Sequence, residues 1–150
     1  LRLAAILRNG GSPATLDVMA ESPRERTLVK LRTPIEVRFK FLSKTRQDVE
    51  QDQIYDGVAP SISAQGCVVS GRIPRLDWVA DLLTQKMMLG INLLLPNDPD
   101  PIKALGEVGW IERIDEATGK CQIGVTFKDI QPADRNKIFA HQVKAQLPGG

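Results

Sequence analysis

Ser61, Ser63 and Gly66 are spaced closely enough to form one polar corner of the chain. A short β-branched run, residues 67–70, follows them, so the pattern predicts a strand, a corner and a second strand. Strand side chains alternate, which would place both serine hydroxyls on the same side. We expect Gly66 to turn the chain with a positive φ or to let a ligand approach the backbone. The corner is therefore the candidate binding site, and the remaining chain is its β-rich scaffold.

The same residues also have a purely structural interpretation. Serines in turns commonly hydrogen-bond to their own backbone, and glycine favours turns on steric grounds alone. It therefore stays open whether Ser61 and Ser63 bind a ligand or only form the turn. Gly66 is expected to be structural under both interpretations.

A cation-rich segment lies upstream of the corner, at residues 21–34. Its positively charged side chains are Arg24, Arg26, Lys30 and Arg32. A guanidinium can hold a phosphate through two parallel hydrogen bonds and can stack on a flat ring, whereas lysine supplies charge alone. A solvated connector is the alternative, because charged runs usually face water.

The composition argues against several classes of function. One histidine and two widely separated cysteines give no pattern for a metal centre or a Ser-His-Asp triad. The chain also lacks a phosphate-cradling glycine loop, so we expect no enzyme. The formal net charge of +2 over 150 residues is too small to predict nucleic-acid binding.

The cellular setting is inferred from cysteine usage and from hydropathy. Cys67 and Cys121 are expected to be buried free thiols rather than a disulfide. No apolar run reaches the ~20 residues that span a bilayer, and no signal peptide is recognisable, so we expect a cytoplasmic protein. The chain begins at Leu1, which suggests a fragment or a processed chain whose neighbouring domain is missing.

Hydrophobic alternation predicts the strands that would hold the corner. Residues 35–41 alternate without interruption between apolar and charged side chains. Further strands are expected at residues 54–63, 67–70, 88–95, 102–115 and 121–128, the last two pairing as a hairpin. Helical spacing predicts a short helix over 75–86, a final helix from Pro132, and one more over residues 1–8. This order of elements indicates a small barrel or a β-sandwich.

Several segments together resemble the PilZ domain family over residues 24–146. Leu93-Leu94-Leu95-Pro96 is similar to the family's strand ending in proline, residues 106–110 to its Gly-x-Val-x-Trp strand, and residues 124–127 to its Gly-Val-x-Phe strand. The helix with Arg135 and Ile138 comes where the family has its last helix. The resemblance implies a mainly β fold, a six-stranded antiparallel β-barrel with a C-terminal helix over residues 24–150. Residues 1–23 would be an N-terminal extension or the tail of an upstream domain, and residues 75–86 a short inserted helix.

The resemblance also implies a ligand, cyclic di-GMP. The family usually binds it through Arg-x-x-x-Arg before the first strand and through Asp/Asn-x-Ser-x-x-Gly at the corner. The candidate ligand-binding residues are therefore Arg24, Arg26, Lys30, Arg32, Ser61, Ser63 and Gly66. This chain departs at two places: Ser61 stands for the acid or amide, and Arg26 and Lys30 give Arg-x-x-x-Lys. Losing one charge-assisted hydrogen bond costs about 1.5–3 kcal/mol, or about ten- to a hundredfold in affinity.

Two hypotheses follow. In the first, the chain is a non-catalytic cyclic di-GMP receptor that passes ligand occupancy to an effector protein or a neighbouring domain. In the second, it is a ligand-free adaptor that uses the same barrel for protein–protein interaction. Neither requires a cofactor or a metal.

Three smaller expectations concern tryptophans and acids. Trp110 is expected in the core or lining the barrel. Trp78 is expected to cap the barrel or to face a partner, and with Leu82 it makes the helix over 75–86 a candidate for self-association into a homo-oligomer. Asp77 and Asp81 are four residues apart and are expected to serve helix solubility.

Overall fold

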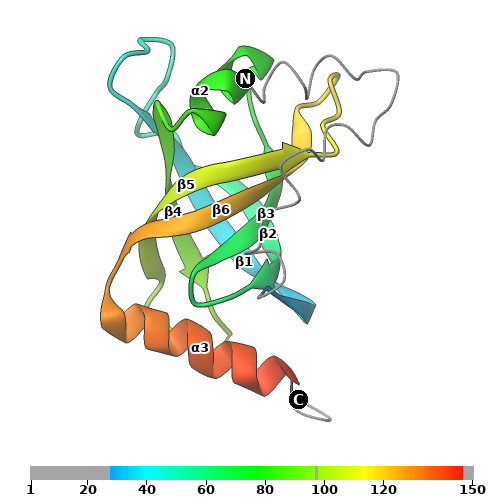
Figure 1. Cartoon of the computed structure of the whole chain (residues 1–150), viewed down its shortest axis with the longest axis vertical. Helices are drawn as coiled ribbons and strands as arrows, with labels where there is room; N and C mark the ends of the chain where they lie inside the picture. The colour runs from blue at the N-terminus through cyan, green and yellow to red at the C-terminus, as the bar shows by residue number, and fades with distance from the viewer. Residues whose placement is uncertain (1–27, 97, 147–150) are drawn as a thin grey trace.

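Among residues 28–96 and 98–146, which the computed structural model describes, six strands close into an antiparallel barrel (Figure 1). The strand order is β1-β2-β3-β6-β5-β4, and β4 pairs back onto β1. The strands are β1 (Val29–Ser43), β2 (Tyr55–Ile62), β3 (Gly66–Arg72), β4 (Met87–Leu94), β5 (Ile102–Glu112) and β6 (Lys120–Ile130). A 3₁₀ turn, η4 (Leu76–Trp78), continues into α2 (Val79–Leu83), and α3 (Pro132–Gln146) follows the barrel. The pairing of β4 with β1 decides between the two predicted architectures, because a sandwich would leave these edges open.

β1 has the alternation that its sequence predicts. Ile35, Val37, Phe39 and Phe41 are each 1% exposed, and the charged residues between them lie on the outside. Successive strand side chains point to opposite faces, so burying one set in the barrel leaves the other set in water. β5 is shorter than expected and ends at Glu112, because the next residue, Arg113, has a φ of 57°.

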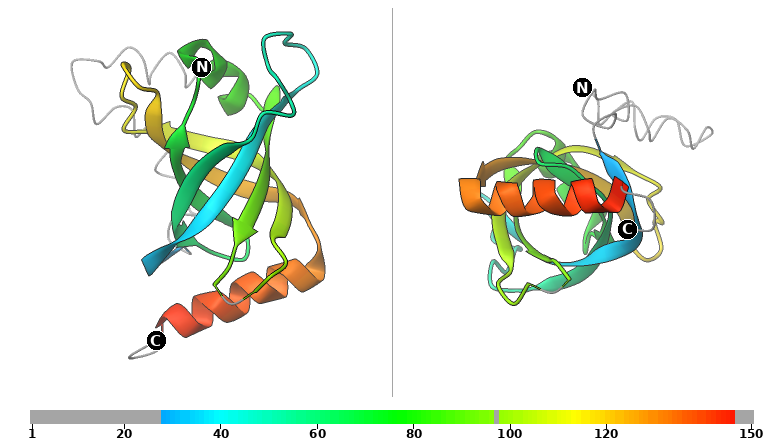
Figure 2. Two further views of the ribbon diagram at one scale, coloured as in Figure 1. Left: turned by 180° about the vertical axis from the view of Figure 1, so that it is seen from behind. Right: turned by 90° about the horizontal axis from the view of Figure 1, so that it is seen from below.

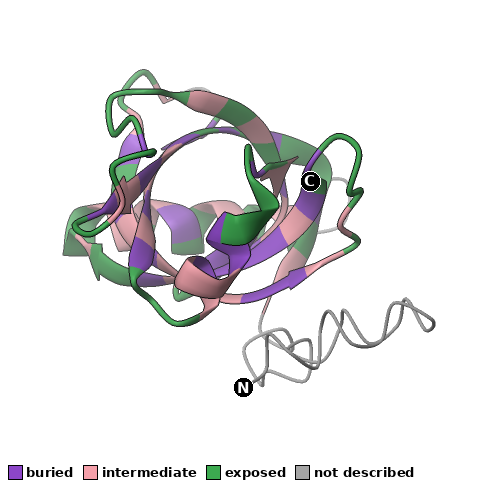
Figure 3. Ribbon diagram, turned by 90° about the horizontal axis from the view of Figure 1, so that it is seen from above, coloured by how far each residue is buried: buried purple, intermediate pink, exposed green. Residues whose placement is uncertain are grey.

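A helix covers each end of the barrel. α3 crosses the lower opening and α2 lies over the upper one (Figures 2 and 3). Trp78 is 3% exposed, Leu82 is fully buried, and the Trp78 ring centroid is 5.1 Å from that of Phe41. Of the two roles expected for Trp78, capping the barrel is confirmed. The expectation that Trp78 and Leu82 form a self-association surface is wrong, because both side chains are buried in the core.

Ion pairs fasten α2 to the loop between β1 and β2. The Arg46 guanidinium lies 2.9 Å from Asp48, 2.9 Å from Asp77 and 3.4 Å from Asp81. The Trp78 indole N–H donates a hydrogen bond to the Asp48 carboxylate at 3.1 Å. Asp77 and Asp81 therefore do more than keep the helix soluble, because they pair with an arginine from another segment.

Acid is expected to loosen this end of the barrel. Hydrogen bonds from Arg46 and Trp78 hold the pKa of Asp48 well below its usual value. A carboxyl whose pKa is lowered by folding stabilises the fold in its ionised form, so this contribution is complete above about pH 4 and is lost as the pH falls further. We expect the free energy of unfolding, measured with urea, to fall as the pH is lowered from about 4 to about 2, and Asp48→Asn to reduce that fall. Asp52→Asn, in the same loop, is the matched control, and an equal fall of the free energy of unfolding in the Asp48→Asn variant would contradict the prediction.

The two cysteines are free and buried, as expected. Burial raises the pKa of the Cys67 thiol and of the Cys121 thiol to about 12. A thiol with such a pKa carries little thiolate at neutral pH, so neither group is a nucleophile under ordinary conditions.

Several predictions lie outside the described residues. These are the helix over residues 1–8, the tail at 1–23, and the positions of Arg24 and Arg26. Within residues 28–96 and 98–146, no helix has the length and apolar character needed to cross a membrane.

Candidate functional site

The predicted corner is the connection between β2 and β3. The Ser63 N–H donates to the Gly66 carbonyl oxygen at 2.8 Å, and the Ser63 hydroxyl oxygen accepts from the N–H groups of Gln65 (3.1 Å) and Gly66 (3.2 Å). Ser63 is only 2% exposed. Its hydroxyl therefore holds the bend together, which is the structural role that the sequence left open for it.

Gly66 is needed for a reason other than its φ. The expectation of a positive φ is wrong, because Gly66 does not have one. A Cβ atom at Gly66 would instead overlap the carbonyl oxygen of Val125 and lie 3.2 Å from the Thr126 Cα atom. A ligand was the expected neighbour of this backbone, whereas the close approach that the structure shows is made by β6. A side chain here would push β3 and β6 apart at the corner.

Arg135, in the first turns of α3, anchors the same corner. Its guanidinium donates a hydrogen bond of 2.6 Å to the Ala64 carbonyl oxygen. The Phe127 N–H donates another of 2.8 Å to the Gln65 carbonyl oxygen. The corner is thus held by hydrogen bonds from β6 and from α3, so a displacement of α3 would also displace the corner. Sequence reasoning gave Arg135 no role at the corner, because the two hydrogen-bonded residues are 71 positions apart.

Removing this anchor is expected to loosen the corner without unfolding the barrel. Arg135→Met keeps the stem of the side chain and removes the donor, so we expect a loss of about 1.5 kcal/mol in the free energy of unfolding. Faster hydrogen exchange at the Gln65 and Gly66 amides should accompany it. Lys144→Met removes a charge from the same helix and should do neither. Unchanged exchange at the corner in Arg135→Met would contradict the prediction.

Strand pairing brings the end of the cation-rich segment to the corner. Lys30 lies opposite Ser61 in the pairing of β1 with β2. Ile62 is fully buried, so its neighbour Ser61 points to the outside of the barrel, on the same face as Lys30. Residues directly opposite each other on antiparallel strands have Cβ atoms about 5 Å apart. A ligand on this surface would therefore meet an ammonium and a hydroxyl together.

The same outer stripe continues to Trp110, which was expected in the core or lining the barrel: its burial is confirmed, but its side chain lies on the outer face of the sheet. Val68 lies opposite Gly124, and Gly124 lies opposite Trp110. The register shifts between Val108 and Trp110, since β5 there accommodates one extra residue, Gly109. A bulge of this kind moves the following side chain to the other face. Trp110 therefore lies outside, against Gly124, where a Cβ atom would overlap the indole.

This stripe has a polar end and an apolar end. Val68 and Trp110 are 7% and 5% exposed, so the apolar end of the stripe is buried, whereas Ser61 is half-buried and Lys30 is exposed. The polar end suits an anionic group or a ring with hydrogen-bonding edges. Among the described residues, no group of three or more histidine, cysteine or acidic side chains could hold a metal ion.

Arg32 is not brought to the corner. The pairing of β1 with β2 is irregular between Lys30 and Ile35. Arg32 instead lines a separate hollow of about 330 Å³ with Leu31, Lys144 and others, between the start of β1 and the second half of α3. Of the seven candidate residues, the structure brings together Lys30, Ser61, Ser63 and Gly66, and Arg24 and Arg26 lie outside the described part of the chain.

Comparison with known proteins gives one family and several structural neighbours. The model of the PilZ domain family matches residues 21–142. The structure of the Bacillus subtilis inhibitor of motility, MotI/DgrA, aligns with a TM-score of 0.56 and 16% identity, over 83% of this chain and 56% of that one. MrkH from K. pneumonia in its apo state aligns with a TM-score of 0.57 and 19% identity, over 83% and 51%. At these identities the likeness shows a shared fold, and this chain spans about half the length of either protein. No curated protein matches.

Proposed function

The chain belongs to the PilZ domain family, and from this premise we propose that it is a receptor for cyclic di-GMP. In this proposal the domain is cytoplasmic and bacterial, performs no catalysis, and passes ligand occupancy to an effector protein or a neighbouring domain. The observation that carries the proposal is the pairing of Lys30 with Ser61. That pairing joins the two segments through which the family usually binds its ligand.

Covalent geometry keeps the upstream arginine near this pair. Arg26 precedes Lys30 by four residues, so the chain cannot carry its backbone more than about 14 Å from Lys30. An arginine side chain on such a tether can fork to a phosphate or to the O6 and N7 atoms of a guanine. Arg24 and Arg26 are therefore proposed to close over a ligand that rests on Lys30 and Ser61.

The other candidates have different proposed roles. Ser61 offers its hydroxyl to a guanine edge, while Ser63 and Gly66 give the corner its shape through hydrogen bonds and close strand packing. Arg32 lines the hollow beside α3. Its proposed role is to change position there when ligand binding moves the cation-rich segment. The two departures from the family motif weaken binding. Ser61 has no carboxylate, and the Lys30 ammonium cannot form the two parallel hydrogen bonds of a guanidinium.

Isothermal titration calorimetry of the chain with cyclic di-GMP tests the proposal. We expect saturable heat in the micromolar range, and an affinity about tenfold lower in Lys30→Ala, which loses one charged contact. Lys44→Ala removes an exposed lysine after the far end of β1 and should leave the affinity unchanged. No heat at high micromolar ligand would reject the receptor and favour the ligand-free adaptor.

A further inference from the structure

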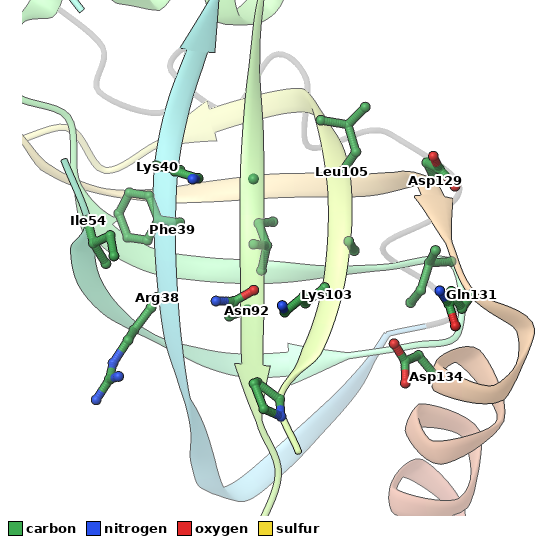
Figure 4. A pocket seen from close by; sticks show the side chains of 15 residues that line it. Arg38, Phe39, Lys40, Ile54, Asn92, Lys103, Leu105, Asp129, Gln131 and Asp134 are labelled. Atoms are coloured by element: carbon green, nitrogen blue, oxygen red, sulfur yellow. The ribbon is translucent and has the colours of Figure 1, made fainter. Parts of the chain in front are cut away.

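A second concave surface lies around the barrel from the corner. It is a groove of about 520 Å³ across the outer face of β1, β4 and β5, and it continues to the start of α3 (Figure 4). None of the residues that the cyclic di-GMP proposal uses lines it. The groove therefore needs an explanation of its own.

Strand register builds this groove from two rows of side chains. Arg38 lies opposite Asn92, and Asn92 lies opposite Lys103, so these three residues form a row across β1, β4 and β5. The neighbouring row has Gly90 in the middle, between Lys40 and Leu105. Gly90 has no side chain of its own, and the Leu42 and Lys40 side chains lie 3.4–3.7 Å from the position that its Cβ atom would take.

The cations of the groove are available to a partner. Among the described residues, neither Lys40 nor Lys103 has a carboxylate as close as the 3.7 Å that separates Arg38 from Asp56. The side chains of that pair are 59% and 89% exposed, and an exposed pair of this kind contributes little. A carboxylate arriving at the groove would therefore displace no strong interaction.

The opposite end of the groove carries negative charge. Asp129 and Asp134 line it beside the start of α3, and Gln131 lies between them in the sequence (Figure 4). The groove is thus positive over β1, β4 and β5 and negative toward α3. A uniformly charged polyanion such as a nucleic acid would be repelled at that end, whereas a segment with acidic residues followed by a basic one would match both ends.

We propose that this groove binds an extended acidic segment of a partner protein, with a basic residue directed toward Asp129 and Asp134. Strands are spaced about 4.8 Å apart, so Arg38 and Lys103, two strands apart, are about 10 Å from each other. Extended chain advances about 3.3 Å per residue and its side chains alternate, so acidic residues two or four positions apart, about 7 or 13 Å, share one side and bracket this separation. Asn92, between the two cations, can hydrogen-bond to the backbone of the segment through its amide. Because the groove and the corner are separate, both can be occupied at once.

A labelled peptide tests the proposal on the whole chain. The probe has four glutamates separated by glycines, a short serine-glycine spacer and two lysines, and the control probe has the same composition with the charges alternating. We expect titration of the first peptide to shift the ¹⁵N-¹H resonances of Lys40, Asn92 and Lys103. We expect the control peptide to bind at least about fivefold more weakly, since it cannot match both ends of the groove.

Two variants distinguish the groove from general surface charge. Lys40→Glu with Lys103→Glu should lower the affinity for the acidic peptide about tenfold, because two attractive contacts become repulsive. Lys120→Glu with Lys128→Glu makes the same change of charge on β6 and should lower it less than twofold. Equal losses in the two double variants, shifts confined to other residues, or tighter binding of single-stranded DNA than of the peptide would each overturn the proposal.

Discussion

Gly66→Ala is expected to destabilise the fold by about 3 kcal/mol and to abolish cyclic di-GMP binding. The added methyl group would overlap the Val125 carbonyl oxygen, and backbone atoms cannot move aside as a flexible side chain can. The β3 and β6 strands would have to separate at the point where the corner is held. Urea unfolding measures the first effect and calorimetry the second.

Gly90→Ala is the matched control for this substitution. Gly90 is also a strand glycine, but a Cβ atom there would lie 3.4 Å from the Leu42 side chain, which is ordinary contact. We expect its effect on the free energy of unfolding to stay below about 1 kcal/mol. An equal loss of stability in the two variants would contradict the argument from close packing at Gly66.

Ser61→Asp is expected to raise the affinity for cyclic di-GMP by about ten- to a hundredfold. The aspartate would accept charge-assisted hydrogen bonds from a guanine edge, which the serine hydroxyl cannot match. The sign of the effect is informative, because cyclic di-GMP carries two negative charges. An added carboxylate that did not meet the guanine would weaken binding through repulsion. Combining it with Lys30→Arg, which restores the fork and the stacking plane, should raise the affinity further.

Ser70→Asp supplies the matched control for the aspartate. Ser70 lies on the same outer face of β3 as Val68, two residues further from the corner. We expect the affinity of the Ser70→Asp variant for cyclic di-GMP, measured by calorimetry, to be equal to or lower than that of the unsubstituted chain. A gain in both variants would point to a change in the fold rather than to a guanine contact, and a loss in Ser61→Asp would remove Ser61 from the ligand site.

Local patterns in the sequence were enough for most of the secondary structure. The alternation of residues 35–41 predicted the buried face of β1, and the two apolar runs after residue 101 predicted the pairing of β5 with β6. Proline in the first turn predicted the start of α3 at Pro132. These predictions succeeded because strand and helix periods depend on neighbours within a few residues. The corner at residues 61–66 was located for the same reason, since turn residues act locally.

What the corner residues do was decided only by the tertiary structure. Gly66 is required by a carbonyl on β6, Arg135 reaches the Ala64 carbonyl from α3, and Trp110 lies outside because one extra residue shifts the register of β5. None of these relations has a local pattern, because each depends on which strands meet and in what register. The sequence alone determined where strands and turns lie, and the closed barrel decided which of their side chains share a surface.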